Sequence, residues 1–143
     1  MKSKLLFTTV LLIMFSAVYV AQSNKGDVDE FVNNYLQNLN TNNTSGISKV
    51  LHDDGSFFGV NDITNKTVNN SAEEYVELIK TGRLGGWNGT AEVNHVSVNT
   101  NIASADVQIS NGRLKQTQYL TLLKTDEGWK VINATYSLSK DNS

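Results

Sequence analysis

The sequence predicts an α+β fold, with helices collected at the start of one domain and strands at its end. Apolar residues recur at helical spacing only before residue 82, whereas residues 90–138 alternate between apolar and polar side chains. Segregated helices and strands are typical of an α+β fold in which the helices cover one face of a sheet. The chain carries no internal repeat or heptad pattern, so we expect residues 24–143 to form a single domain.

The first predicted helix begins at Asp27. Its carboxylate can cap the first turn, and Glu30 stands at the spacing of a capping box. Residues at helical spacing then form one apolar face, and the polar run 40–44 ends the helix. The members of this face are Val28, Phe31, Val32, Tyr35, Leu36 and Leu39.

A short second helix is expected to follow, with Ile47, Val50 and Leu51 facing inward. The residues 52–55, His-Asp-Asp-Gly, are turn formers and are predicted to end this helix. We expect a short strand at 56–60, and then a polar loop over 61–70 with an extended piece around 66–68.

The third predicted helix begins after Ser71, which forms a second capping box with Glu74. Its inner face contains Tyr75 and Ile79, and Gly82 is a natural stop because glycine adopts the left-handed conformation. The glycine-rich stretch 82–89 lacks the Lys-Ser/Thr pair of a phosphate-binding loop, so we interpret it as a connection.

Four strands are predicted to complete the chain as an antiparallel meander. The turn signals are Asn99–Asn101, Asn111–Gly112 and Thr125–Gly128. Several strands carry apolar residues on both faces, which is unusual for a sheet with one face in water. We therefore expect a second subunit to cover the outer face, giving a homodimer through the sheet. The strands span Thr90–Val98, Ile102–Ser110, Arg113–Lys124 and Trp129–Leu138.

Residues 1–23 have the pattern of a secretory signal peptide. Lys2 and Lys4 precede an uncharged apolar run, and small residues before Asn24 suit cleavage there. The alternative is a membrane anchor, but the run is short compared with the ~20 residues that span a bilayer. The sequence thus predicts an exported protein, periplasmic or extracellular, with no membrane contact after cleavage.

Charge and cysteine content exclude several classes of protein. Removal of Lys2 and Lys4 changes the formal net charge from 12 − 14 = −2 to 10 − 14 = −4. An acidic chain without a basic run does not suit nucleic-acid binding. Cysteine is absent, which suits a bacterial exported domain that needs no disulfide. We predict no cofactor and no metal site, since no ligand cluster has metal-binding spacing.

Three ionisable residues are candidates for acid–base catalysis: Asp54, His95 and Asp106. Asp54 lies beside His52, where both residues suit turn capping equally well. His95 has the strand parity of Val93 and is predicted to face the interior, as a ligand contact or as a hydrogen-bonded structural residue. Asp106 is a buried base if its strand face points inward and a solvated carboxylate if it points outward.

Aromatic side chains supply the candidate ligand-binding residues. Rings that carry one polar atom suit a pocket that stacks a flat molecule, although they suit a hydrophobic core equally well. The candidates for the pocket are Tyr35, Tyr119, Trp87 and His95.

The segments Asp27-x-x-x-Phe31-x-x-x-Tyr35-Leu36 and Gly128-Trp-Lys-Val-Ile132 resemble the nuclear transport factor 2-like superfamily. Within it, the stretch Leu51-His-Asp-Asp-Gly-Ser-Phe57 and the Ser71-x-Glu-Glu-Tyr75 helix start look like the bacterial group named "putative lumazine-binding". The resemblance extends from about Asp27 to Leu138.

This resemblance implies a cystatin-like cone: three N-terminal helices packed on a curved, mainly antiparallel sheet, with a pocket at the open end. It also implies dimerisation through the sheet. The superfamily includes ketosteroid isomerase, in which an Asp acts as the base, but the corresponding position here falls near Gly59. We therefore expect non-catalytic binding of a small molecule. The alternatives are an enzyme with an Asp or His base and a protein-interaction module.

Overall fold

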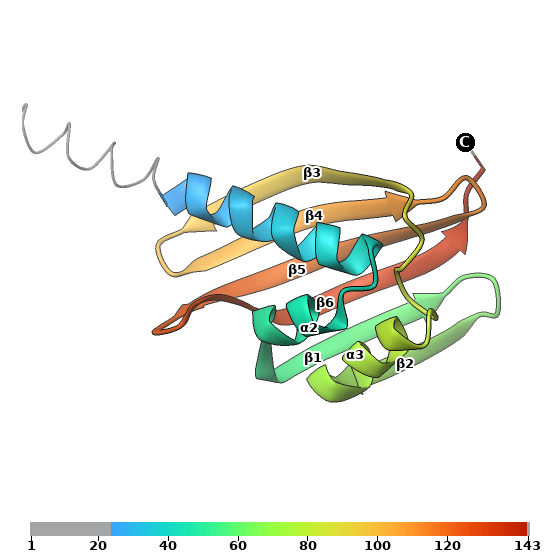
Figure 1. Ribbon diagram of the computed structural model, residues 1–143, viewed down its shortest axis with the longest axis horizontal. Coiled ribbons are helices and arrows are strands. Elements are labelled where there is room, and N and C mark those ends of the chain that lie inside the picture. Colours follow the sequence, from blue (N-terminus) through green and yellow to red (C-terminus); the bar gives the residue numbers. More distant parts are fainter. Residues whose placement is uncertain (1–23, 143) are drawn as a thin grey trace, which may run out of the picture.

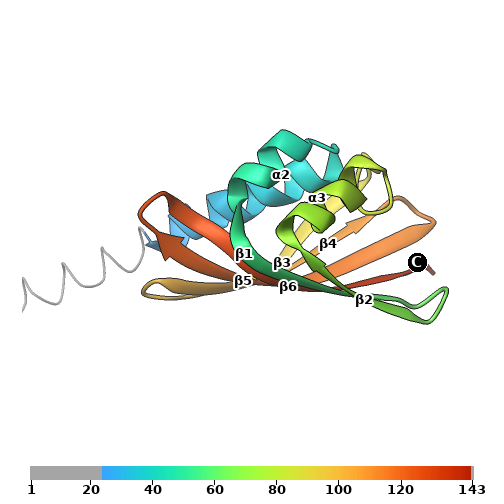
Figure 2. The same ribbon diagram turned by 90° about the horizontal axis from the view of Figure 1, so that it is seen from below.

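The computed structural model describes residues 24–142, which form helices packed on one face of a curved six-stranded sheet (Figure 1, Figure 2). The strand order is β2-β1-β6-β5-β4-β3, and every neighbouring pair is antiparallel except β1 with β6. The predicted α+β class is therefore confirmed, with a mixed sheet. The elements are an N-terminal helix over 24–40, α2 (Thr44–Val50), β1 (Leu51–Asn61), β2 (Lys66–Ser71), α3 (Ala72–Lys80), β3 (Thr90–Asn99), β4 (Ile102–Ser110), β5 (Leu114–Thr125) and β6 (Gly128–Lys140).

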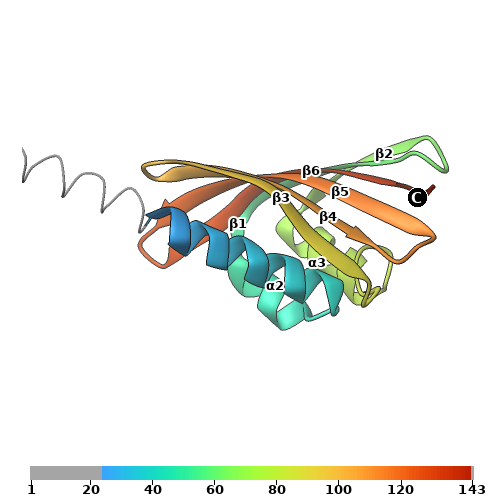
Figure 3. The same ribbon diagram turned by 90° about the horizontal axis from the view of Figure 1, so that it is seen from above.

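The helices lie side by side over the sheet (Figure 3). The N-terminal helix lies along β3 and β4, and α3 lies over β1 and β2. The apolar face predicted for the N-terminal helix is confirmed, because Val28, Val32, Tyr35 and Leu39 are completely buried. In Figure 2 the β1–β2 hairpin extends beyond the helices at one end of the sheet.

Both ends of α3 follow from the local sequence. The Ser71 hydroxyl accepts from the Glu74 N–H, and the Glu74 carboxylate accepts from the Ser71 N–H, so the predicted capping box is present. After the helix, Gly82 has φ +71°, the left-handed conformation that stops a helix. The Gly82 N–H donates to the Ile79 carbonyl and the Arg83 N–H to the Leu78 carbonyl. These two bonds form a Schellman motif.

The predicted hairpins of the second half are confirmed. Asn111 and Gly112 lie between β4 and β5, and Gly112 has φ +79°, which only glycine adopts without strain. β5 and β6 are joined by a tight turn, in which Thr125 pairs with Gly128. Local turn chemistry therefore sets the register of the meander.

Between residues 51 and 71 the expected strand at 56–60 and the extended piece around 66–68 are confirmed, but the bounds of both were wrong. His52–Gly55 do not end a helix, because β1 already begins at Leu51 and pairs with Val131 of β6. The predicted loop 61–70 contains β2, which is six residues long and antiparallel to β1. In both places pairing between strands outweighs the turn propensity of Asp, Asn and Gly, since that propensity is weak compared with tertiary contacts.

A β-bulge in β3 reverses one predicted orientation. The register of β3 against β4 shifts between Val93 and His95. Because the extra residue in a bulge breaks the alternation of side chains, Val93 and Val96 both pack against the core while His95 is exposed. The prediction that His95 faces the interior is therefore wrong.

The predicted signal peptide, residues 1–23, lies outside the described residues. Within residues 24–142, no helix combines the length and the apolar character needed to cross a bilayer.

Candidate functional site

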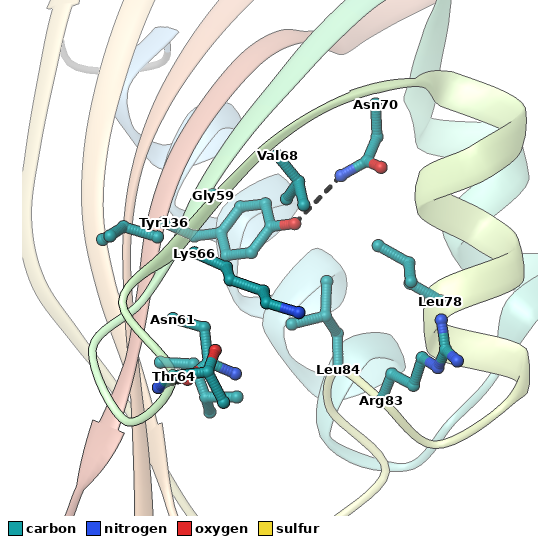
Figure 4. Close-up of a pocket in the computed structure, with 12 residues that line it drawn as sticks. Gly59, Asn61, Thr64, Lys66, Val68, Asn70, Leu78, Arg83, Leu84 and Tyr136 are labelled. Atoms are coloured by element: carbon teal, nitrogen blue, oxygen red, sulfur yellow. Dashed lines mark hydrogen bonds between the residues drawn. The ribbon is translucent and has the colours of Figure 1, made fainter.

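One hollow of about 340 Å³ opens between the β1–β2 hairpin, β6 and the end of α3 (Figure 4). We call it the hairpin-end cavity. Its volume falls within the range of ligand pockets, roughly 300–1,000 Å³. It is lined by Gly59, Val60, Asn61, Thr64, Lys66, Val68, Asn70, Leu78, Arg83, Leu84, Tyr136 and Leu138.

Two asparagines, Asn61 and Asn65, set the conformation of the β1–β2 turn that forms one wall of the cavity. The Asn61 carboxamide oxygen accepts from the N–H groups of Ile63 and Thr64, both at 3.0 Å. Asn65 then adopts φ +52°, a left-handed conformation that asparagine tolerates better than most residues. These two features close the turn and place Lys66 directly opposite Asn61, as the first residue of β2.

The opposite wall is fixed by the Schellman motif at the end of α3. This motif reverses the chain at Gly82, so that the Arg83 side chain stands exposed at the rim and Leu84 turns into the core. Only 4% of Leu84 is exposed. The half-buried Leu78 in the last turn of α3 completes this wall.

The floor is the ring of Tyr136, which lies over Gly59 on the neighbouring strand. A Cβ added at Gly59 would approach the Tyr136 Cζ to 2.2 Å, so the glycine provides the space for the ring. The Tyr136 hydroxyl accepts from the Asn70 Nδ2 at 3.0 Å, as Figure 4 shows. Burial raises the pKa of Tyr136 above its usual value, since the phenolate would lose hydration.

The charges at the rim of the hairpin-end cavity are all positive. Lys66 and Arg83 contribute an ammonium and a guanidinium group, and no lining residue is acidic. Neither side chain forms an ion pair within residues 24–142. The cavity therefore combines an apolar floor with a positive rim.

A second polar cluster lies inside the core, between the N-terminal helix, α3 and β5. The Tyr35 hydroxyl donates to the Gln118 Oε1 at 2.7 Å, and the Gln118 Nε2 donates to the Tyr75 hydroxyl at 2.8 Å. The two hydroxyls are 2.9 Å apart. Since Tyr35 has already given its only proton to Gln118, Tyr75 must donate to Tyr35. We call this closed set the tyrosine–glutamine ring.

The tyrosine–glutamine ring is isolated from water. Both tyrosines have no exposed surface, and the ring of Tyr75 stacks on Phe57 with centroids 4.4 Å apart. Burial, followed by repulsion from Tyr75, raises the pKa of Tyr35 far above its usual value. The pKa of Tyr75 is also raised, mainly by burial. Each hydroxyl donates one hydrogen bond and accepts one within the ring, so neither tyrosine has a proton left to donate to a ligand.

The residues predicted as ligand contacts do not line the hairpin-end cavity. Tyr35 belongs to the tyrosine–glutamine ring, and Trp87 lies in the loop after α3, partly buried against the core. The candidate base Asp54 is exposed on β1, where its own N–H donates to the His52 Nδ1 at 3.1 Å. Within residues 24–142, no group of three His, Asp or Glu side chains could hold a metal ion.

Three further residues predicted for the site, His95, Asp106 and Tyr119, lie next to one another on the outer face of the sheet. Cross-strand pairing aligns Thr135 with Tyr119, Tyr119 with Asp106, and Asp106 with His95. Thr135 in turn pairs with Phe58 of β1. These five residues form the outer row, beside an open hollow of about 500 Å³. Asp106 thus points outward, where its Oδ1 accepts from the Asn94 Nδ2.

Sequence reasoning missed Lys66, Arg83, Asn70 and Tyr136 as cavity residues. The signal for Arg83 was present, because a helix stop at Gly82 places the next side chain just beyond α3. For Lys66 and Asn70 the signal was weak, since only an extended piece around 66–68 was expected within a loop, and pairing with β1 makes the whole segment 66–71 a strand.

Comparisons with known proteins agree with this architecture. A model of the family described as "Putative lumazine-binding" matches residues 23–137. A nuclear transport factor 2-like protein of unknown function from Silicibacter pomeroyi DSS-3 superposes with a TM-score of 0.72 at 14% identity, covering 83% of this chain and 98% of that one. A similar protein of unknown function from Shewanella baltica OS155 gives 0.69 at 19% identity, covering 86% and 98%.

A cystatin-like fold protein from Burkholderia xenovorans LB400 superposes with a TM-score of 0.61 at 15% identity, covering 79% of this chain and 89% of that one. No curated protein matches the chain. At these identities the structural similarities establish the fold alone.

Proposed function

Because the chain belongs to the "putative lumazine-binding" family, we propose that it is an exported protein that binds a small apolar or aromatic molecule without catalysis. The ligand occupies the hairpin-end cavity, at the open end of a cone made by the helices and the bent sheet. The observation that carries the proposal is the cavity of about 340 Å³, floored by Tyr136 and walled by leucines.

The composition of the cavity supports binding over catalysis. A base must lie within hydrogen-bond reach of the proton that it removes, and the residues that line the hairpin-end cavity include no carboxylate or imidazole. The candidate bases Asp54, His95 and Asp106 lie outside this lining, the last two on the outer row. The enzyme alternative therefore has no base in this cavity.

Native mass spectrometry of the protein purified from its own host tests whether a small molecule is retained. A fluorescence titration with lumazine, the molecule in the family description, provides a second test. Val68→Trp should block the cavity, because this exposed residue of β2 lines it. Thr67→Trp is the matched control, since Thr67 is also exposed on β2 but does not line the cavity. Equal retention of the molecule by both variants would contradict binding in this cavity.

We also propose that two copies associate through the outer face of the sheet. Tyr119 is 60% exposed and Phe58 44%, and exposed rings on one face are typical of protein interfaces. Tyr119→Lys should shift the protein from dimer to monomer in size-exclusion chromatography with light scattering. Gln37→Lys, on the exposed side of the N-terminal helix, should leave the mass unchanged. A wild-type protein that is monomeric at micromolar concentration would refute this proposal.

Export is the third part of the proposed function. Its support is the predicted signal peptide at residues 1–23. Mass spectrometry of the protein from its own host should find a mature chain that begins at Asn24, and cell fractionation should recover it outside the cytoplasm. An intact Met1 on the cytoplasmic protein would contradict export.

A further inference from the structure

We propose that the hairpin-end cavity selects an amphipathic anion: a small apolar body that carries an oxyanion such as a carboxylate, sulfonate or phosphate. The inference rests on the proposed function, since it names the chemical class of the ligand for the same cavity. The body would pack on the floor, and the oxyanion would lie at the rim between Lys66 and Arg83.

The two cations come from opposite walls. Lys66 begins β2, and Arg83 follows the Schellman motif of α3. Figure 4 shows the two side chains on opposite sides of the opening, with the Lys66 ammonium directed toward Leu84. A guanidinium binds a carboxylate or a phosphate through two parallel hydrogen bonds, and an ammonium adds a mobile point charge. An oxyanion that lies between these two side chains would be attracted by both charges.

Two other basic residues of the chain have a carboxylate partner, although further exposed cations such as Lys49 have none among the ion pairs of residues 24–142. Lys80 lies 3.4 Å from the Glu77 carboxylate, and Lys130 lies 3.1 Å from that of Glu127. Lys66 and Arg83 form no such pair within residues 24–142. The mature chain carries net charge 10 − 14 = −4, so an all-positive rim is a local exception to its charge. The local excess of positive charge at this rim therefore favours an anion.

A helix C-terminus also favours a nearby cation, which provides a purely structural explanation for Arg83. That explanation does not extend to Lys66, which comes from a different element. The carbonyls of Leu78 and Ile79 are already bonded by the N–H groups of Arg83 and Gly82. The Arg83 side chain is therefore not required to satisfy them.

The floor determines the orientation of the ligand. The half-buried Leu78 and Leu138, the buried Leu84 and the Tyr136 ring line the interior, whereas Lys66 and Arg83 are exposed. An apolar body gains most by covering the interior, and an oxyanion keeps part of its hydration at the rim. A neutral molecule with the same body would lack the rim contacts.

Two fluorescent probes with the same body test the inference. 1-Anilinonaphthalene-8-sulfonate carries a sulfonate, and N-phenyl-1-naphthylamine is the same framework without it. Both are titrated against the mature chain 24–143 at low ionic strength, because salt screens exposed charges. The variants are Lys66→Gln, Arg83→Gln and the double variant. Lys49→Gln and Arg113→Gln are the controls, since they remove exposed charges that do not line the cavity.

We expect the sulfonate probe to bind the wild type more tightly than the neutral probe. Each cavity variant should weaken its binding about five-fold and the double variant at least ten-fold, as for partly exposed charge pairs. The neutral probe should change less than two-fold. Both control variants should behave as the wild type.

The possible failures are distinguishable. If both probes bind, Val68→Trp abolishes their binding, and the double variant leaves the ratio of their affinities unchanged, the anion inference is overturned while the proposed function stands. If neither probe binds, or if Val68→Trp has no effect on either, the proposed function fails and the inference with it.

Discussion

The tyrosine–glutamine ring and the hairpin-end cavity contain the same type of hydrogen bond in two different settings, one sealed in the core and one open to a ligand. In each, a tyrosine hydroxyl bonds a side-chain amide: Tyr35 and Tyr75 with Gln118 in the core, and Tyr136 with Asn70 in the cavity. In the core the hydrogen bonds close on themselves under complete burial. In the cavity the tyrosine lies beside an open space with two unpaired cations within residues 24–142.

The difference shows that a polar aromatic residue is not by itself a sign of a binding site. What distinguishes the two regions is whether every hydrogen-bonding group already has a partner. A satisfied buried network stabilises one conformation, and removal of a member leaves other groups unpaired at a cost. A partly open cluster is available to a ligand.

Gln118→Ala should have the largest effect on stability. It removes one hydrogen bond from each tyrosine of the ring and leaves a cavity, so we expect the free energy of unfolding to fall by about 3–4 kcal/mol. Urea denaturation followed by circular dichroism measures it. Gln108→Ala is the control, because Gln108 is half-buried on β4 without a side-chain hydrogen bond in the described part of the chain, and should cost under about 0.5 kcal/mol.

Gly59→Ala tests the cavity floor. Its Cβ would collide with the Tyr136 ring, so we expect the ring to shift and change the shape of the hairpin-end cavity that it lines. We expect a loss of about 1–3 kcal/mol in the free energy of unfolding, typical of overpacking, and weaker binding of the sulfonate probe. The double variant Gly59→Ala/Tyr136→Leu should recover part of the stability because the smaller side chain relieves the clash. An unchanged affinity in Gly59→Ala would show that Tyr136 is not the floor.

The tyrosine–glutamine ring should make the protein sensitive to alkali. The pKa values of Tyr35 and Tyr75 are raised in the folded state, so these phenols stay protonated where the unfolded chain, with a pKa of about 10, has ionised. Stability is therefore complete below pH ~10 and is lost as the pH rises above it. Each such phenol contributes a slope of about 1.4 kcal/mol per pH unit.

Tyr35→Phe should cost about 1–2 kcal/mol at neutral pH, since it leaves the Gln118 Oε1 without its donor and the Tyr75 hydroxyl without its acceptor, while Gln118 and Tyr75 still bond each other. It should also make the alkaline loss shallower, because one shifted phenol is gone. Denaturation curves from pH 8 to pH 12 measure both effects. Parallel pH profiles for this variant and the wild type would argue against the ring as the cause of the alkaline loss.

Tyr136→Phe should have the smallest effect. The hydroxyl accepts one hydrogen bond from Asn70, which also approaches the Phe57 carbonyl at 3.4 Å. We expect a change under about 1 kcal/mol in the free energy of unfolding, because Asn70 keeps access to another acceptor. Thermal denaturation can resolve it. A cost as large as that of Gln118→Ala would mean that the two regions are energetically alike.

Much of the fold was predictable because its signals are local. The capping box of Ser71 and Glu74, the stop at Gly82 and the turn at Asn111–Gly112 each depend on a few consecutive residues. The start of β1 at Leu51 was not predictable, because it depends on pairing with β6, some eighty residues later. The candidate site was mostly unpredicted for the same reason: β2 is a strand only beside β1.

The sequence by itself determined the helices, the hairpins of the second half and the division into an apolar interior and a polar exterior, because periodicity and turn chemistry act between neighbouring residues. Only the tertiary structure decided which tyrosine is sealed in the core, which face His95 occupies and which cations meet at one rim. Those outcomes depend on a bulge, a parallel strand pair and a helix end that bring distant residues together. Contacts between residues so far apart in the sequence cannot be inferred from any short stretch of it.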